Sequence, residues 1–194
     1  MLSTAHIALK EWAIVTSSLV RGEQILLLRK GGIQEKRGDF EVEHREFLLF
    51  PTYVHQKAED LVPEVREAFA AVAAARPVDG TVSLGCYAVV EEVIRVTDLA
   101  PLRELAREHV LSWSAVEQRF WYKNRPGLHV LLLRAYRLPV PHVIPNTPRY
   151  EGCVSWVELD HPLSTAGARP ALSDTDFTRR AEQVRQVLAA FLPS

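Results

Sequence analysis

Residues suited to acid–base or ion-binding chemistry are concentrated between Arg29 and Gln56. There the charged run EVEHRE leads into the apolar run FLLF, which PTYVHQ follows. An apolar strand that ends abruptly in polar residues is a frequent ligand site, because the buried strand fixes the side chains at its end. We therefore predict that this segment holds the functional centre of the domain.

The histidines of this segment are the candidate catalytic groups. Alternate side chains of an extended chain share a face, so His44 and Glu46 lie on one face and Glu43 and Arg45 on the other. His44 and Glu46 could act as a base with its orienting carboxylate, or as two metal ligands. His55 lies just beyond the strand and could reach the same pocket. The alternative, an exposed and charged edge strand, stays open.

A second candidate feature is an anion site after the apolar run ILLL, where two cations precede two glycines. The guanidinium and ammonium groups supply positive charge, and glycine lets the backbone approach an anion closely. A solvated basic turn would have the same composition, so that alternative also stays open. The predicted ligand-binding residues are Arg29, Lys30, Gly31, Gly32, Glu43, Arg45, Thr52 and Gln56, and the predicted catalytic residues are His44, Glu46 and His55.

Little in the sequence supports a metal or cofactor site. The segment offers two histidines and two carboxylates, but no third ligand close enough to complete a metal site. The chain also has no Walker loop, GxSxG, HExxH or GxGxxG motif. We expect no cofactor, and magnesium or manganese only if the protein is a nuclease. Cys86 and Cys153 form no CxxC pair, so we expect free buried thiols in a reducing compartment.

An aromatic and basic cluster marks the segment 113–125. It could stack on bases or a nucleotide, since rings stack on bases and cations attract phosphate. Packing of a short amphipathic helix against the core is the interpretation that we favour. The residues are Trp113, Trp121 and Tyr122 beside Arg119, Lys123 and Arg125.

The composition predicts one globular domain over residues 1–194. The chain is 47% hydrophobic and 24% charged, which is enough apolar content for a core. Its net charge of -1 exerts no long-range attraction on nucleic acid, so binding of DNA or RNA would need a local basic patch. We see no signal peptide and no apolar run near the roughly 20 residues of a membrane span. We expect a cytoplasmic protein without a membrane partner.

The hydrophobic pattern predicts an α+β fold, in which a mixed β-sheet is flanked by helices. The tract WAIVTSSLV is rich in β-branched residues, and with ILLL it predicts a hairpin. Ser173 and Asp174 are typical of a helix start. The expected elements are a hairpin over 7–28, strands over 40–50, 81–96, 128–138 and 153–159, an extended proline-rich loop over 139–148, and helices from 60, 98, 114 and 173.

Four strings resemble an uncharacterised bacterial and archaeal family, a domain of unknown function: ALKEW, ILLLRKGGI, HREFLLFPTYVHQ and GCVSWVEL. The resemblance runs over nearly the whole chain. Members of that family are sometimes found with restriction-endonuclease-type domains, which implies a link to DNA cleavage or defence.

The order of elements is also similar to that of a Nudix domain, with a helical insertion near 98–126. Nudix hydrolases hold magnesium on helical glutamates. When the family's pattern is aligned on Arg66 and Glu67, Ala58, Ala70 and Ala71 stand where those glutamates would be. The resemblance therefore implies a Nudix-like shell without the usual metal catalysis.

Three functions remain open at this point. The first, which we favour, is a domain that binds a phosphate ligand, either an anionic small molecule such as a nucleotide or a nucleic acid. The second is a metal-dependent nuclease or phosphoesterase. The third is a protein-interaction subunit without a small ligand. The sequence does not decide whether the protein is an enzyme, nor its oligomeric state.

Overall fold

The computed structural model describes residues 1–30, 44–78, 80–150, 152 and 155–191. The strands are β1 (Thr4–Trp12), β2 (Leu26–Arg29), β3 (Glu46–Thr52), β4 (Thr81–Val96), β5 (Leu128–Pro145), β6 (Trp156–Ser164) and β7 (Arg169–Pro170). The helices are α1 (Ala13–Val20), α2 (Arg66–Ala74), α3 (Ala100–Glu104), α4 (Trp113–Phe120) and α5 (Asp174–Ala189). Short 3-10 turns lie at 58–60, 63–65, 122–124 and 148–150.

One mixed sheet organises the chain in the order β2-β5-β4-β3-β1-β6, with β7 added to β5. β1 and β3 are parallel, and the other pairs are antiparallel. Because β1 and β3 run the same way, Trp12 and Thr52 lie side by side where both strands end. The mixed sheet with flanking helices confirms the predicted α+β class.

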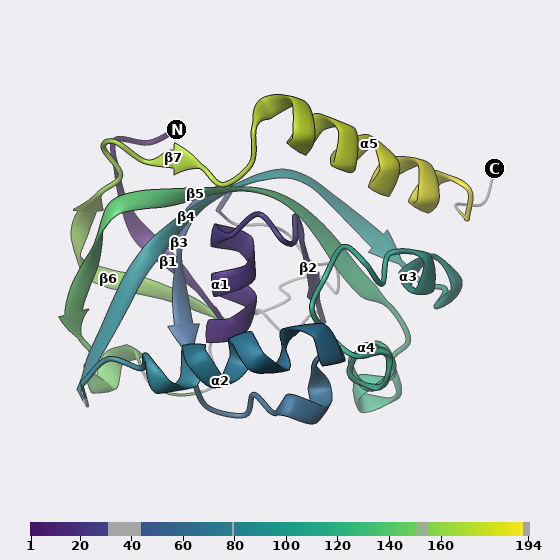
Figure 1. Cartoon of the computed structure of the whole chain (residues 1–194), viewed down its shortest axis with the longest axis horizontal. Coiled ribbons are helices and arrows are strands. Elements are labelled where there is room, and N and C mark those ends of the chain that lie inside the picture. Colours follow the sequence, from purple (N-terminus) through teal and green to yellow (C-terminus); the bar gives the residue numbers. More distant parts are fainter. Residues whose placement is uncertain (31–43, 79, 151, 153–154, 192–194) are drawn as a thin grey trace.

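The predicted hairpin over 7–28 is wrong, because α1 lies between β1 and β2. Six of the eight α1 residues are buried, and Figure 1 shows α1 enclosed on the concave side of the curved sheet. Tertiary burial on all sides therefore overrides the β preference of these residues. Gly22 follows the helix with φ 73°, and a Cβ there would lie 2.8 Å from the side chain of Leu172. Glycine is thus required both by its conformation and by space.

The predicted loop over 139–148 is also wrong, since β5 continues to Pro145. β5 pairs with β4 on both sides of an irregularity, at Cys86 with Arg137 and at Leu84 with His142. Proline cannot donate a backbone hydrogen bond, and a bulge is where a paired strand tolerates it. The shift in register therefore accommodates the prolines without ending the strand.

The helices between β3 and β5 differ in detail from the prediction. Leu61 leaves the predicted helix and bridges to Leu111, and α2 begins only at Arg66. α3 is one short turn. α4 is capped by Ser112, whose hydroxyl accepts from the Ala115 amide, and begins at Trp113, one residue before the predicted start at 114. Ala68, Phe69 and Val72 of α2, with Val65 just before it, pack against the core.

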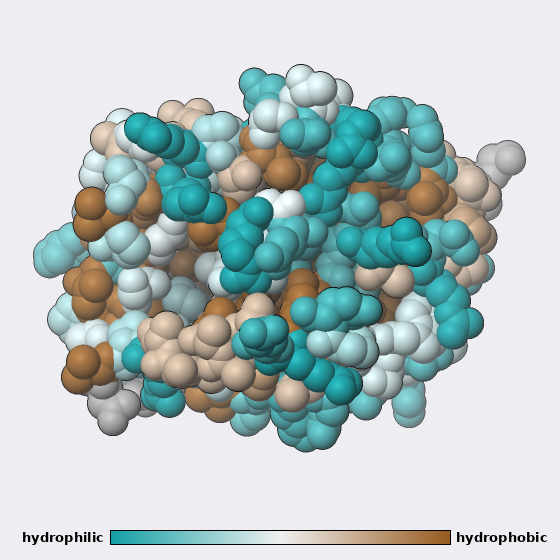
Figure 2. All heavy atoms as spheres, in the orientation of Figure 1, coloured by the Kyte–Doolittle hydropathy of each residue, from teal (hydrophilic) through white to brown (hydrophobic). Residues whose placement is uncertain are grey.

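The C-terminal helix begins where the sequence predicts. The Ser173 hydroxyl accepts a hydrogen bond from the Asp176 amide at 3.0 Å, as an N-cap should. Phe177, Ala181, Val184 and Leu188 are buried. On the face of the molecule seen in Figure 1, hydrophilic and hydrophobic residues alternate over the surface (Figure 2).

The predictions about the cysteines and about membrane-spanning segments can be compared with the structure. Cys86 is a free, fully buried thiol, and burial raises its pKa to about 12, which makes it a poor nucleophile. Cys153 lies outside the described residues. In the part of the chain that the structure describes, no helix has both the length and the apolar character needed to cross a membrane.

His109 makes the stability of the fold depend on pH. It is 6% exposed, and burial, aided by the positive charge of Arg119, lowers its pKa from 6.5 to about 4. Below pH 6.5 this histidine becomes protonated in the unfolded chain, whereas in the folded protein it stays neutral down to about pH 4. The free energy of unfolding therefore falls as the pH is lowered from 6.5 to about 4. We expect this group to contribute a loss of about 1 kcal/mol per pH unit in that window, measured as the free energy of unfolding in urea.

The matched variant is His109→Asn, whose amide oxygen can replace the ring Nδ1 that accepts from the Leu111 amide at 3.2 Å. The variant should show a shallower pH dependence between 6.5 and 4 than the original protein. Parallel curves for the two proteins would contradict the assignment.

Candidate anion-binding cleft

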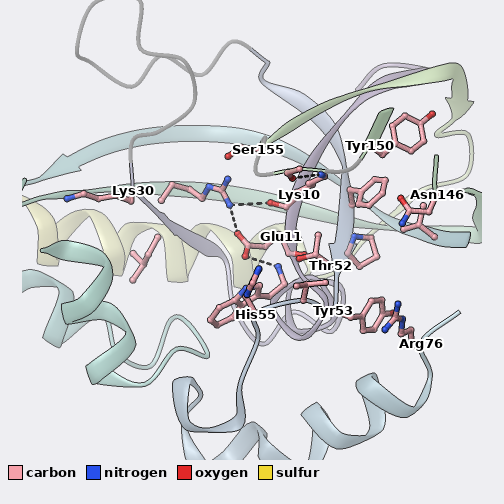
Figure 3. Close-up of a pocket in the computed structure, with 18 of the residues that line it drawn as sticks. Lys10, Glu11, Lys30, Thr52, Tyr53, His55, Arg76, Asn146, Tyr150 and Ser155 are labelled. Atoms are coloured by element: carbon pink, nitrogen blue, oxygen red, sulfur yellow. Dashed lines mark hydrogen bonds and ion pairs between the residues drawn. The ribbon is translucent and has the colours of Figure 1, made fainter. Parts of the chain in front are cut away.

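A cleft of about 700 Å³ opens where the parallel strands β1 and β3 end (Figure 3). The end of β2 completes one wall, and the chain after β3 forms the rim. α1 starts directly after β1, so its N-terminus lies beside Trp12. Five lysine and arginine residues and one carboxylate are among the described residues that line the cleft. They are Lys10, Arg29, Lys30, Arg76 and Arg119, with Glu11.

Glu11 and Arg29 form an ion pair inside the cleft. The Arg29 Nη1 lies 2.9 Å from Glu11 Oε2, and the two side chains are 14% and 4% exposed. Arg29 also donates to the Lys10 carbonyl at 3.2 Å, and the Trp12 amide donates to the other Glu11 oxygen at 2.8 Å. Figure 3 shows this network running from β2 to β1. Arg29 therefore lies in the predicted site, but its guanidinium is held by a carboxylate that the sequence analysis did not place there.

Arg119 reaches the cleft from α4. Its guanidinium carbon lies 4.6 Å from the centre of the Trp12 ring, and its Nη1 donates to the Leu28 carbonyl at 3.3 Å. Burial lowers the pKa of Arg119, and the nearby Glu11 carboxylate opposes that shift. Stacking on an aromatic face and a backbone hydrogen bond fix the position of this charge.

Lys30 lies at the edge of the cleft but serves the backbone of another segment. Its ammonium donates to the carbonyls of Phe120, Arg125 and Gly127, at 2.7 Å and 2.8 Å for the first and last. A lysine ammonium has three hydrogens, so all three are engaged. We therefore leave Lys30 out of the proposed ligand contacts.

His55 and Arg76 also line the cleft, with Arg76 on the side away from Lys30 and His55 between them (Figure 3). The Arg76 guanidinium lies 5.7 Å from the centre of the Tyr53 ring. His55 is exposed and has a φ of 65°, a left-handed conformation that costs a non-glycine residue about 1–2 kcal/mol. Strained residues of this kind collect at functional sites.

Two further predicted ligand residues, Thr52 and Gln56, hold together the elements that form the cleft. The Thr52 hydroxyl donates to the Glu11 carbonyl at 3.2 Å and ties the ends of β3 and β1 together. The Gln56 side-chain oxygen lies 3.5 Å from the Ile14 amide at the start of α1. Thr52 lines the cleft, whereas Gln56 orients the helix that begins beside it.

Three of the remaining predicted residues, among those that the structure describes, do not line this cleft. Glu46 lies at the opposite end of β3 from Thr52, where the Tyr87 hydroxyl and the Leu2 amide donate to it. These contacts, the tyrosine first, lower the Glu46 pKa. The His44 ring packs edge-on against Trp156, 5.2 Å between centres, and the Arg45 side chain is exposed outside the cleft lining. Gly31, Gly32 and Glu43 lie outside the described residues.

The structure adds residues that the sequence analysis did not assign to the site. They are Lys10, Glu11, Trp12 and Arg76, which all line the cleft. The usable signal was the same one that singled out β3: β1 ends in the polar and aromatic string KEW. In the sheet, Glu11 and Trp12 pair directly with Pro51 and Thr52.

The comparisons with known proteins identify the family. The family model described as Domain of unknown function (DUF1802) matches residues 8–183. The chain belongs to this family. That confirms the expected membership of an uncharacterised family, and no curated protein matches the chain.

Solved structures similar to this DUF1802 chain include ASCH from Zymomonas mobilis. That crystal structure is 14% identical, the match covers 97% of this chain and 96% of that chain, and the TM-score is 0.45. A point mutant of the same protein is 13% identical, with 95% and 99% covered and a TM-score of 0.46. At this level of similarity the likeness says nothing about what the DUF1802 chain binds.

Proposed function

We propose that the cleft binds a phosphate-bearing ligand, either a nucleotide or a nucleotide unit of a nucleic acid. The observation that carries this proposal is the charge of the described lining, which holds five lysine and arginine side chains against one carboxylate. Arg29 is paired with that carboxylate, Glu11, and Lys30 binds backbone carbonyls, so the excess of positive charge comes from Lys10, Arg76 and Arg119. In a chain whose net charge is -1, such a local excess of positive charge favours an anion.

The size and the walls of the cleft suit the non-phosphate part of a nucleotide. Ligand sites commonly enclose about 300–1,000 Å³, and this cleft measures about 700 Å³. Trp12, Phe50, Tyr53 and Tyr150 contribute aromatic surface to its walls. Aromatic rings stack on bases of any sequence, while the cations next to them attract the phosphate.

A metal-dependent nuclease receives less support from the geometry. The predicted combination of His55 with Glu46 does not form, because the two lie at opposite ends of β3. Among the described residues no group of three or more His, Cys, Asp and Glu side chains could hold a metal ion. A Nudix-type reaction is not part of the proposal either, because Ala58, Ala70 and Ala71 replace the metal-binding glutamates of that pattern.

Isothermal titration calorimetry with nucleoside monophosphates, the matching nucleosides and inorganic phosphate tests the proposal. We expect the monophosphates to bind and the nucleosides to bind at least about 10-fold more weakly, since they lack the charge-assisted contacts. Arg76→Gln should weaken monophosphate binding about 10-fold. Arg179→Gln, which removes an exposed arginine of α5, is the matched control and should have no effect. If none of the nucleoside monophosphates binds, the proposal is refuted.

His55→Gly separates ligand binding from folding. Glycine adopts the φ of 65° without steric cost, so we expect the free energy of unfolding to stay within about 1 kcal/mol of the original value. Removal of the imidazole from the rim should still weaken monophosphate binding by a few-fold. Unchanged affinity would exclude His55 from the site.

A further inference from the structure

The turn after α4 presents two aromatic side chains to solvent. Trp121 is 53% and Tyr122 is 56% exposed, so the expectation that they pack into the core is wrong. Phe191 at the C-terminal end, 43% exposed, is the other exposed aromatic residue among those the structure describes. Exposed apolar surface that is contiguous can mark an interaction site.

The backbone of the turn that carries Trp121 and Tyr122 is fixed by several contacts. Lys123 and Asn124 both have left-handed conformations, with φ of 57° and 56°, at a cost of about 1–2 kcal/mol each. The Lys30 ammonium binds three carbonyls of residues 120–127 and fixes the turn from inside. The Trp121 ring also packs edge-on against the buried Phe120, 5.0 Å between centres. The exposed rings are therefore pre-positioned.

The charge around the rings is positive. Residues 118–130 contain Arg119, Lys123 and Arg125 and no aspartate or glutamate. The Lys123 ammonium lies 5.4 Å from the centre of the Tyr122 ring. Burial, and then repulsion by Arg125 and Arg95, lowers the pKa of Lys30, which shows that the positive charges lie close to one another. Rings interleaved with cations fit the bases and phosphates of a nucleic acid.

The turn that carries the rings is attached to residues that line the cleft. Arg119 and Lys30 line the cleft, and Phe120, which Lys30 contacts, is followed directly by Trp121. We propose that the cleft ligand is a unit of a single-stranded nucleic acid whose neighbouring bases stack on Trp121 and Tyr122. This inference rests on the proposed function and specifies its substrate class.

Fluorescence anisotropy with labelled oligo(U) and oligo(dT) of one to eight nucleotides tests it. Affinity should rise at least about 10-fold from the mononucleotide to the longer strands. Trp121→Ala should weaken binding of the long strands about 10-fold and leave mononucleotide binding unchanged, while Trp121→Phe should retain most of the affinity. Phe191→Ala is the matched control, since it removes an exposed ring distant in sequence from the cleft, and should have no effect.

The outcomes distinguish the two proposals. If mononucleotides bind but long strands bind no more tightly, or if Trp121→Ala has no effect, the single-strand inference fails and the cleft function stands. If Trp121→Ala weakens mononucleotide and long-strand binding equally, the ring acts on the cleft and the inference also fails. If long strands bind through Trp121 while mononucleotides do not bind, the surface is confirmed and the cleft proposal fails. If neither binds, both are refuted.

Discussion

Replacement of Arg29 by methionine is expected to lower the free energy of unfolding by about 4 kcal/mol. The Glu11 carboxylate is 4% exposed and has the Arg29 guanidinium 2.9 Å away. Removal of one member of a buried ion pair leaves the other charged and desolvated, and that cost exceeds the loss of the contact itself. Urea denaturation followed by tryptophan fluorescence measures the change.

The control for this prediction is the double variant Glu11→Gln with Arg29→Met. It removes both charges, so most of the lost stability should return. An Arg29→Met protein as stable as the original would mean that Glu11 is well solvated. The cleft would then hold an accessible negative charge, which disfavours an anionic ligand.

Replacement of Lys30 by methionine is expected to cost about 4 kcal/mol as well, because hydrogen bonds from a charged donor contribute about 1.5–3 kcal/mol each and are not additive. The ammonium donates to three carbonyls that end α4 and lead into β5, and methionine would leave all three without this donor. Urea denaturation again gives the free energy of unfolding.

Lys123→Met is the matched control for Lys30→Met. It removes an exposed lysine from the same turn and should change stability by no more than about 0.5 kcal/mol. Equal effects of the two substitutions would contradict the assignment of Lys30 as the residue that fixes the turn.

Elements with a strong local pattern could be predicted from the sequence. The strand over 81–96 is β4 with the same bounds, and Ser173 caps α5 as expected. In both cases the local pattern and the burial in the fold agree. The mixed sheet could be predicted because helical and strand patterns alternate irregularly along the chain.

α1 could not be predicted, because its sequence lacks the amphipathic period of a surface helix. Six of its eight residues are buried, the polar Thr16 and Ser18 among them, so burial does not follow a polar and an apolar face. A short buried helix of this kind is hard to tell from a buried strand by its sequence. The extension of β5 through its prolines depends on a bulge opposite β4, which is a property of the pairing and not of either strand alone.

Some of the residues that the sequence singles out lie in the candidate cleft. Arg29, Thr52 and His55 line the cleft, because the end of a buried strand is recognisable from sequence. The roles of Lys30 and Glu46 were not predictable, because their partners are distant in the sequence. The carbonyls that Lys30 binds lie 90 or more residues away, and Tyr87, which donates to Glu46, lies 41 residues away. Trp12 and Arg119 form their contact across a similar separation.

A titration of the ¹⁵N-labelled protein with a nucleoside monophosphate, followed by backbone amide chemical shifts, tests the central claim most directly. We predict the largest shifts at Trp12, Tyr53 and His55, which surround the cleft, and little change in α5. Saturable shifts confined to the opposite end of β3, around Glu46, or no shifts at all, would contradict the account.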